Sequence, residues 1–257
     1  MPPKCTYRRE SFSGRFSYHE INGTNGGVIP MIYLKSLYAS PYTLVYSHAN
    51  AEDISQLKSF LSTLSQQASC NVVCYDYPGY GLNTEPLSEA NVKTTAVSVV
   101  EYLIKVLLVD PKRIILFGHS LGSSVSVFAA VHLAEQLNIT IAGVILQSCF
   151  LSMYRVVDDF RFTSSHDMYC SCDIIGRLPC PVCLIHGVQD VIVPISHAKR
   201  IFLQIPEKHR YLCLFVEGAG HNNIECFCNP TMKYYRFIHG FIEYLSRIAP
   251  TGQIHNA

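Results

Sequence analysis

One stretch limits the folds open to this chain more than any other: Gly118-His119-Ser120-Leu121-Gly122, a serine between two glycines. It follows the apolar run 114–117, which is typical of a buried strand, and it leads into small and apolar residues typical of a helix. A sharp turn between a strand and a helix is strained, and glycines let it pack closely. The pattern therefore predicts a nucleophile elbow, in which the serine hydroxyl is exposed beside a helix N-terminus. The alternative is a Gly-Ser turn without chemistry.

The composition indicates a globular chain with a large core. Of its 257 residues, 49% are hydrophobic and only 15% are charged, which separates it from disordered chains. The sequence shows no internal repeats and no low-complexity linkers. We therefore expect a single domain over residues 1–257, with its core from about residue 12 to residue 248 and short tails at both ends.

Charge and hydropathy exclude several classes of partner. Twenty basic and nineteen acidic side chains leave a formal net charge of +1, and the absence of a basic run argues against nucleic acid as a partner. No apolar run approaches the roughly 18 residues that cross a bilayer. The first residues, Met1 to Cys5, lack the apolar core of a signal peptide. We therefore expect an intracellular, cytoplasmic protein.

The eleven cysteines need an explanation. Their odd number and the expected compartment favour reduced thiols, several of them acting as small hydrophobic residues in strands. The one set resembling a metal site is Cys170, Cys172, Cys180 and Cys183. The first two are close together for one tetrahedral zinc, and the last two lie around a predicted strand. We therefore expect no metal ion and no cofactor.

Strands and helices alternate along the chain, which predicts a mostly parallel sheet covered by helices on both faces. We expect strands over residues 12–21, 28–34, 43–48, 71–76, 114–117, 141–147, 181–186 and 211–216, the first two forming an antiparallel hairpin. We expect helices over residues 53–67, 88–109, the segment after the elbow, 196–203 and 230–248. The segment 148–178 reads as irregular, and it is too short to form a full lid domain.

A serine becomes a nucleophile when a base takes its proton and an acid orients that base. Two residues downstream of Ser120 have the right positions. Asp190 follows the strand over 181–186, and His221 follows the last strand, so both lie where parallel sheets hold their active-site residues. The order serine, acid, histidine is the order of the nucleophile-elbow enzymes. We therefore predict Ser120 as the nucleophile, Asp190 as the acid and His221 as the base.

Other histidines and carboxylates compete for these roles. We interpret His186 as a packed residue that bonds to loop backbone, and we expect His119 not to reach the serine. Asp76 precedes the elbow in sequence and is expected to brace a loop. The remaining acidic candidates are less well placed, being in the irregular segment or after the histidine: Asp158, Asp159, Asp167 and Glu225.

The oxyanion of a tetrahedral intermediate needs two N–H donors that are already in place. One is expected from Leu121, the residue after the nucleophile. The second should come from the loop after the strand over 43–48, and we predict Asn50, with Ala49 as the alternative. A methyl group at position 49 restricts the backbone angles of this loop.

Five segments together resemble one family: His48–Asp53, Tyr75–Gly81, Gly118–Gly122, His186–Asp190 and Glu217–Asn222. They look like the α/β-hydrolase-domain-containing 17 proteins, over roughly residues 12 to 248. The resemblance implies an α/β-hydrolase fold with a mostly parallel central sheet, helices on both faces and no full lid domain. It also implies a serine hydrolase that removes palmitate from cysteines of membrane-associated proteins. Carried over by motif, it assigns Ser120, Asp190 and His221 as the catalytic triad.

The chain departs from the family pattern at three places. The family has His-Gly-Asn where this chain has His48-Ala49-Asn50, and its elbow commonly has glutamine at the position of His119. The family also carries an N-terminal cysteine cluster that is palmitoylated and anchors the enzyme, whereas only Cys5 lies near the start here. Because one lipid chain gives reversible attachment, we expect at most peripheral contact with the cytosolic face of membranes.

We therefore expect a palmitoyl-protein thioesterase that works through an acyl-enzyme, with an acylated protein as its substrate. A small-molecule or lipid carboxylesterase is the first alternative, because the same triad serves both. A catalytically silent hydrolase fold that acts as a binding module is the second alternative.

Overall fold

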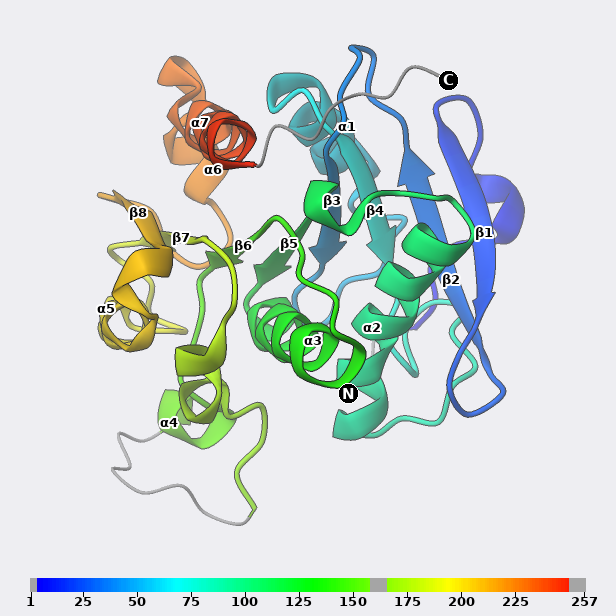
Figure 1. The fold of residues 1–257 in the computed structure, drawn as a ribbon, viewed down its shortest axis with the longest axis horizontal. Coiled ribbons are helices and arrows are strands. Elements are labelled where there is room, and N and C mark those ends of the chain that lie inside the picture. The colour runs from blue at the N-terminus through cyan, green and yellow to red at the C-terminus, as the bar shows by residue number, and fades with distance from the viewer. Residues whose placement is uncertain (1–3, 158–165, 250–257) are drawn as a thin grey trace.

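The computed structural model describes residues 4–157 and 166–249, and one sheet of eight strands runs through its centre (Figure 1). The order across the sheet is β1-β2-β4-β3-β5-β6-β7-β8. The strands are β1 (Phe16–Asn22), β2 (Val28–Leu34), β3 (Thr43–Ser47), β4 (Asn71–Tyr75), β5 (Ile114–His119), β6 (Gly143–Gln147), β7 (Val182–Gly187) and β8 (Arg210–Val216).

The sheet is mostly parallel, as predicted. The hairpin of β1 and β2 is antiparallel, with Phe16 opposite Leu34, and β2 also pairs antiparallel with β4. From β4 to β8 every pairing is parallel. Because helices cover both faces, β3, β5, β6 and β7 are buried along their whole length, and they read as apolar runs rather than as alternating patterns.

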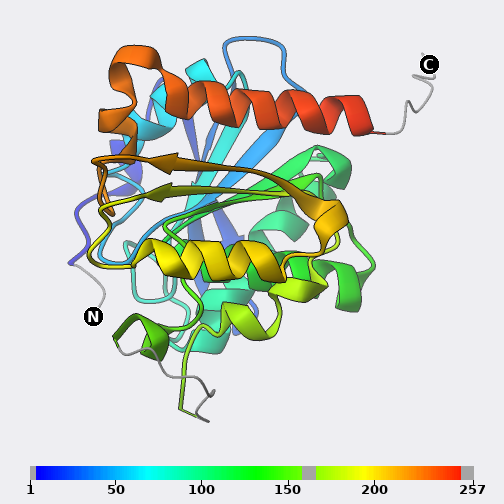
Figure 2. The ribbon, with the colours of Figure 1, turned by 90° about the vertical axis from the view of Figure 1, so that its left-hand side faces the viewer.

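Two hydrophobic clusters lie on the two faces of the sheet. Helices α2, α3 and α5 contribute to one cluster, and α1 and α7 contribute to the other; Figure 2 shows α5 and α7 on opposite sides of the strands. The helices are α1 (Lys58–Gln67), α2 (Glu89–Lys105), α3 (Leu121–Leu137), α4 (Met153–Val157), α5 (Ile195–Gln204), α6 (Ile224–Phe227) and α7 (Lys233–Ile248). Short 3₁₀ turns lie at Arg9–Ser11, Pro111–Arg113, Ser171–Asp173, Ile175–Arg177, Glu207–His209 and Asn229–Thr231.

Several predicted boundaries are wrong, and local contacts explain them. The first helix begins at Lys58 instead of residue 53, because the Asp53 carboxylate binds the backbone N–H groups of Ser55 and Thr6 and holds the chain in turns. Helix α2 ends at Lys105, and Leu108 beyond it has a left-handed backbone with φ of 55°. Other ends shift by one to four residues: the strand expected from 12 begins at 16, that from 141 begins at 143, and the helix expected from 230 begins at 233.

The segment between β6 and β7 holds little regular structure. Its described part contains only α4 and two 3₁₀ turns, so no lid domain is present within residues 148–157 and 166–178. Two acidic candidates of the sequence, Asp158 and Asp159, lie outside the described residues. No helix within 4–157 and 166–249 is long and apolar enough to cross a membrane.

Candidate functional site

The turn from β5 into α3 places Ser120 at the start of a helix. Ser120 has φ of 51° and ψ of −114°, a strained conformation for a residue with a side chain. Its N–H donates to the carbonyl oxygen of Gln147 at 2.9 Å. A Cβ on Gly118 would overlap the carbonyl of Gly122, and one on Gly122 would overlap that of Ser47. The two glycines are therefore required by close backbone approach, as the sequence predicts.

Three side chains from three loops form a hydrogen-bonded row. His221 Nε2 lies 2.9 Å from Ser120 Oγ, and His221 Nδ1 lies 2.7 Å from Asp190 Oδ2. Because Nδ1 faces a carboxylate, it carries the ring proton and donates it, which leaves the lone pair of Nε2 facing the hydroxyl. This is the arrangement in which an imidazole accepts a serine proton.

Asp190 is held as a carboxylate by its surroundings. Its Oδ1 accepts the backbone N–H groups of Ile192 and Val193 at 2.9 and 2.8 Å. Burial by itself would raise the pKa of Asp190, but the hydrogen bonds from His221 and from Val193 outweigh it and lower the pKa below its usual value. The carboxylate therefore stays charged beside His221, where it would stabilise a positive charge on that ring.

The backbone of His221 is fixed from two sides. Its carbonyl oxygen accepts hydrogen bonds from His119 Nε2 at 3.2 Å and from Ser148 Oγ at 3.3 Å. Burial and the neighbouring His221 lower the pKa of His119 to about 4, so that ring is neutral at pH 7 and donates from Nε2. His119 thus binds the backbone of His221, while the hydroxyl of Ser120 is bonded to His221 Nε2; this agrees with the prediction that His119 does not reach the serine.

The competing residues have structural contacts. His186 Nε2 donates to the carbonyl of Val193 at 2.8 Å, which is the loop-backbone bond predicted for it. Asp76 braces loops, also as predicted: its Oδ1 accepts the N–H of Ile54 at 3.0 Å and its Oδ2 accepts the hydroxyl of Tyr7 at 2.5 Å. Two further acidic candidates are placed elsewhere: Asp167 binds the backbone around α4, and Glu225 lies in α6.

Two free backbone N–H groups border the serine. Leu121 is the first residue of α3, where an N–H has no intrahelical acceptor. Within residues 4–157 and 166–249, neither the N–H of Leu121 nor that of Asn50 has a hydrogen-bond acceptor. The N–H of Ala49 donates to Glu52 Oε2 at 3.1 Å, so the alternative donor of the sequence analysis, Ala49, is already engaged. Ala49 is also absent from the described residues with positive φ, so its methyl group does not strain the loop.

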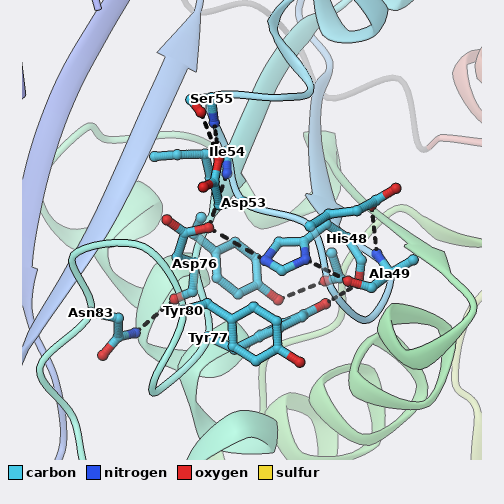
Figure 3. Close-up of polar contacts among 12 residues, drawn as sticks. His48, Ala49, Asp53, Ile54, Ser55, Asp76, Tyr77, Tyr80 and Asn83 are labelled. Carbon is cyan, nitrogen blue, oxygen red and sulfur yellow. Dashed lines mark hydrogen bonds and ion pairs between the residues drawn. The ribbon is translucent and has the colours of Figure 1, made fainter. Parts of the chain in front are cut away.

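Buried aromatic rings support the loop after β3. His48 packs against Tyr77 with ring centroids 4.2 Å apart, and the Tyr77 hydroxyl donates to the carbonyl of His48 at 2.7 Å. Tyr80 donates to the side-chain oxygen of Asn50 at 2.5 Å. Figure 3 shows the His48 ring between the labelled Asp76 and Ala49, its Nδ1 2.7 Å from the Ala49 carbonyl. The loop that carries Asn50 is therefore held by hydrogen bonds and ring contacts from buried side chains.

A cavity of about 440 Å³ opens over the serine. Part of its lining comes from the loop 49–52, and an apolar part comes from the residues after β6, from α4 and from the loop after β7. Its lining is Ala49, Asn50, Ala51, Glu52, Ser120, Leu121, Phe150, Met153, Val156, Ile192, Val193, His221 and Asn222. The cavity is therefore lined by the predicted nucleophile, the predicted base and both predicted oxyanion donors: Ser120, His221, Leu121 and Asn50.

No cysteine is among the residues that line this cavity. All eleven are free thiols, and burial raises the pKa of Cys170 and Cys180 to about 12. In the part of the chain that the structure describes, no group of three or more His, Cys, Asp or Glu side chains is arranged to hold a metal ion.

Sequence reasoning missed two contributors to the site. Glu52 lines the cavity and accepts the N–H of Ala49. Its spacing of three residues from Ala49, the spacing of a capping box, is a signal that could have identified it. The second is the hydrogen bond from His119 to the carbonyl of His221, which joins residues 102 positions apart in the sequence. No local sequence pattern predicts such a contact.

Comparisons with known proteins support the fold and point to a family. A family model described as the alpha/beta hydrolase family matches residues 48–168. The chain is 34% identical over 214 residues to alpha/beta hydrolase domain-containing protein 17C of Xenopus laevis, covering 83% of this chain and 66% of the relative. It is 35% identical to the human 17C protein, covering 80% of this chain and 61% of the relative. With the 17B protein of Xenopus laevis the identity is 32%, covering 84% of this chain and 72% of the relative. The chain thus spans less than two thirds of the length of the 17C relatives.

Solved structures resemble the fold at low sequence identity. An esterase from Pyrococcus furiosus superposes with a TM-score of 0.71 at 13% identity, covering 95% of this chain and 99% of that one. An alpha-beta hydrolase from Vibrio vulnificus superposes with a TM-score of 0.69 at 15% identity, covering 86% and 81%. These likenesses show the α/β-hydrolase fold.

Proposed function

This chain belongs to the family of α/β hydrolase domain-containing 17 proteins, and from that premise we propose that it is a serine hydrolase that cleaves acyl thioesters or esters through an acyl-enzyme. The observation that carries the proposal is the row of Ser120, His221 and Asp190, with 2.9 Å and 2.7 Å between the bonded atoms. A hydroxyl, an imidazole and a carboxylate in this order form a nucleophile with its base and its orienting acid.

The reaction proceeds in two halves. His221 Nε2 takes the hydroxyl proton of Ser120 while Oγ bonds to the acyl carbon, and the carbonyl electron pair moves onto oxygen. The N–H groups of Leu121 and Asn50 would bind this oxyanion. When the pair returns, the bond from carbon to the leaving sulfur or oxygen breaks, and the leaving group takes the proton from His221. A water molecule repeats these steps on the acyl-enzyme, which frees Ser120 and releases a carboxylic acid.

We further propose that the substrate is a long-chain acyl thioester on a protein cysteine. The apolar cavity wall, with Phe150, Met153 and Ile192, suits an aliphatic chain. No lid domain covers the serine within the described residues of the segment after β6, and this suits a bulky protein substrate. The family resemblance implies the same substrate class. Because such substrates are associated with membranes, the enzyme would meet them at the cytosolic face.

The test is hydrolysis of an S-palmitoylated peptide by the purified protein, with Ser120→Ala as the control. The proposal predicts release of palmitate by the wild type and none above background by Ser120→Ala. Equal release of palmitate by both proteins, or no release by either, would overturn the proposal. A peptide carrying the same acyl chain on serine separates the two substrate classes: preference for the oxygen ester would favour a carboxylesterase.

A further inference from the structure

The oxyanion loop, defined as His48 to Asn50, contains two consecutive peptide units with four polar groups. Three of the four are bonded. The carbonyl of His48 accepts the Tyr77 hydroxyl at 2.7 Å, the N–H of Ala49 donates to Glu52 Oε2 at 3.1 Å, and the carbonyl of Ala49 lies 2.7 Å from Nδ1 of His48. The fourth group, the N–H of Asn50, has no acceptor in the described part of the chain.

We propose that Glu52 is a positioning residue that locks this loop so that the Asn50 N–H is held toward the cavity. The inference deepens the proposed function and rests on it. Glu52 touches no reacting atom in this role, because it acts through the N–H of Ala49.

Peptide geometry explains why the lock matters. The described residues contain no cis peptide bond, and in a trans unit the C=O and the N–H point in opposite directions. The hold of His48 on the Ala49 carbonyl therefore sets the direction of the Asn50 N–H. The preceding peptide unit, between His48 and Ala49, can rotate relative to it about the backbone angles of Ala49. Tyr77 binds the C=O of this unit, and Glu52 binds its N–H. Without Glu52, only the Tyr77 hydroxyl holds the peptide unit between His48 and Ala49. The N–H of Ala49 then has no acceptor and competes with the N–H of Asn50 for the oxyanion.

Glu52 is suited to this task by its place in the cavity wall. It lies three residues after Ala49, the spacing at which a glutamate reaches back to a backbone N–H at helix starts. It is half-buried and lines the same cavity as Ser120. Burial raises the pKa of Glu52, while the nearby His48 and His221 oppose that rise. Glu225, Tyr46 and Cys74 are also near enough for the charge of Glu52 to raise their pKa values.

Two substitutions separate the hydrogen bond from the charge. Glu52→Gln keeps an oxygen that accepts the Ala49 N–H and removes the carboxylate, whereas Glu52→Ala removes both. Glu225→Ala is the matched control, because Glu225 is a neighbouring half-buried carboxyl that does not bind the loop. The measurement is kcat and KM for a short-chain p-nitrophenyl ester, with urea unfolding of each variant alongside.

We expect Glu52→Ala to lower kcat at least tenfold with KM within twofold of the wild type, because an oxyanion donor acts mainly in the transition state. We expect Glu52→Gln to stay within threefold of the wild-type kcat, and Glu225→Ala to match the wild type. The inference is overturned if Glu52→Ala keeps its kcat, or if Glu52→Gln is as impaired as Glu52→Ala.

This outcome is distinct from failure of the proposed function. Absence of Ser120-dependent turnover in the wild type would overturn both proposals. An active wild type with an equally active Glu52→Ala would overturn the positioning role alone. If Glu52→Ala does not fold, the Gln variant decides: a folded Glu52→Gln with kcat lowered tenfold contradicts the role of the hydrogen bond.

Discussion

The ring of His119 donates from Nε2 to the carbonyl oxygen of His221 at 3.2 Å, so the residue before Ser120 holds the backbone of His221. The two rings lie with centroids 5.5 Å apart. Burial of the ring and the neighbouring His221 favour the neutral form of His119, although the hydrogen bond to the His221 carbonyl opposes that shift. Because the pKa of His119 is lowered in the folded protein, protonation of this ring is linked to the stability of the fold.

Replacing His119 with glutamine should weaken the pH dependence of stability. The pKa of His119 is lowered from 6.5 to about 4. Between these pH values the ring is protonated in the unfolded chain and neutral in the folded protein. No stability is lost above pH 6.5, and the loss accumulates as the pH falls from 6.5 to 4, reaching about 3 kcal/mol. Urea unfolding of both proteins at pH 7.5, 5.5 and 4 measures the difference.

The glutamine amide still offers an N–H to the carbonyl of His221, so the variant should fold at neutral pH. We expect the wild type to lose about 3 kcal/mol more than His119→Gln between pH 7.5 and pH 4. Parallel stability curves for the two proteins would contradict a neutral, buried His119.

Replacing Asp190 with asparagine should lower kcat by about 10³- to 10⁴-fold with little change in KM. An asparagine oxygen can still accept the N–H groups of Ile192 and Val193, but its NH₂ then faces His221 Nδ1 and favours the ring tautomer that cannot accept the Ser120 proton. Steady-state kinetics on a p-nitrophenyl ester measure the effect. An Asp190→Asn enzyme with more than a tenth of the wild-type kcat would show that another group orients His221.

Removing the Ser120 side chain should relieve backbone strain. A residue with a side chain at φ of 51° and ψ of −114° stores of order 1–3 kcal/mol, and glycine adopts these angles more easily. Both Ser120→Ala and Ser120→Gly abolish the nucleophile, so their comparison isolates the backbone. We expect Ser120→Gly to be more stable than Ser120→Ala by about 1 kcal/mol in urea unfolding. A less stable glycine variant would show that the elbow is not strained at this residue.

Replacing Tyr7 with phenylalanine should destabilise the protein by about 1–3 kcal/mol. The Tyr7 hydroxyl donates to Asp76 Oδ2 and accepts the N–H of Leu82 at 3.2 Å, and its loss leaves a buried carboxylate oxygen without that donor. Tyr38→Phe is the control, because that side chain is 58% exposed, and we expect it to change stability by less than about 0.5 kcal/mol. Equal unfolding midpoints for the two variants would show that the Tyr7 bond does not stabilise the fold.

Much of the fold follows from sequence patterns because parallel sheets simplify the problem. Buried strands read as apolar runs, and their carboxyl ends meet along one edge. Asp190 and His221 each follow such a strand, so the expectation that they meet near Ser120 needed only the order of elements. The glycines of the elbow carried their own signal, because a sharp strand-to-helix turn has few compatible residues.

The details that escaped the sequence depend on contacts between distant segments. The start of α1 at Lys58 is set partly by Thr6, which binds Asp53 from 47 residues away. The hydrogen bond from the Ala49 N–H to Glu52 forms only because the loop turns back toward Glu52. The Ala49 methyl group causes no strain, because the φ of Ala49 is not positive. Local propensity cannot report such contacts, since they exist only after the chain has packed.

Labelling by a fluorophosphonate probe, followed by mass spectrometry of the digested protein, tests whether Ser120 is an activated nucleophile. The probe bonds to a serine only where a base has activated the hydroxyl. We predict one labelled residue, Ser120, and a labelling rate that falls at least a hundredfold in His221→Ala. No labelling of the folded wild type, or equal labelling of the His221→Ala variant, would contradict this prediction and favour a binding module without catalysis.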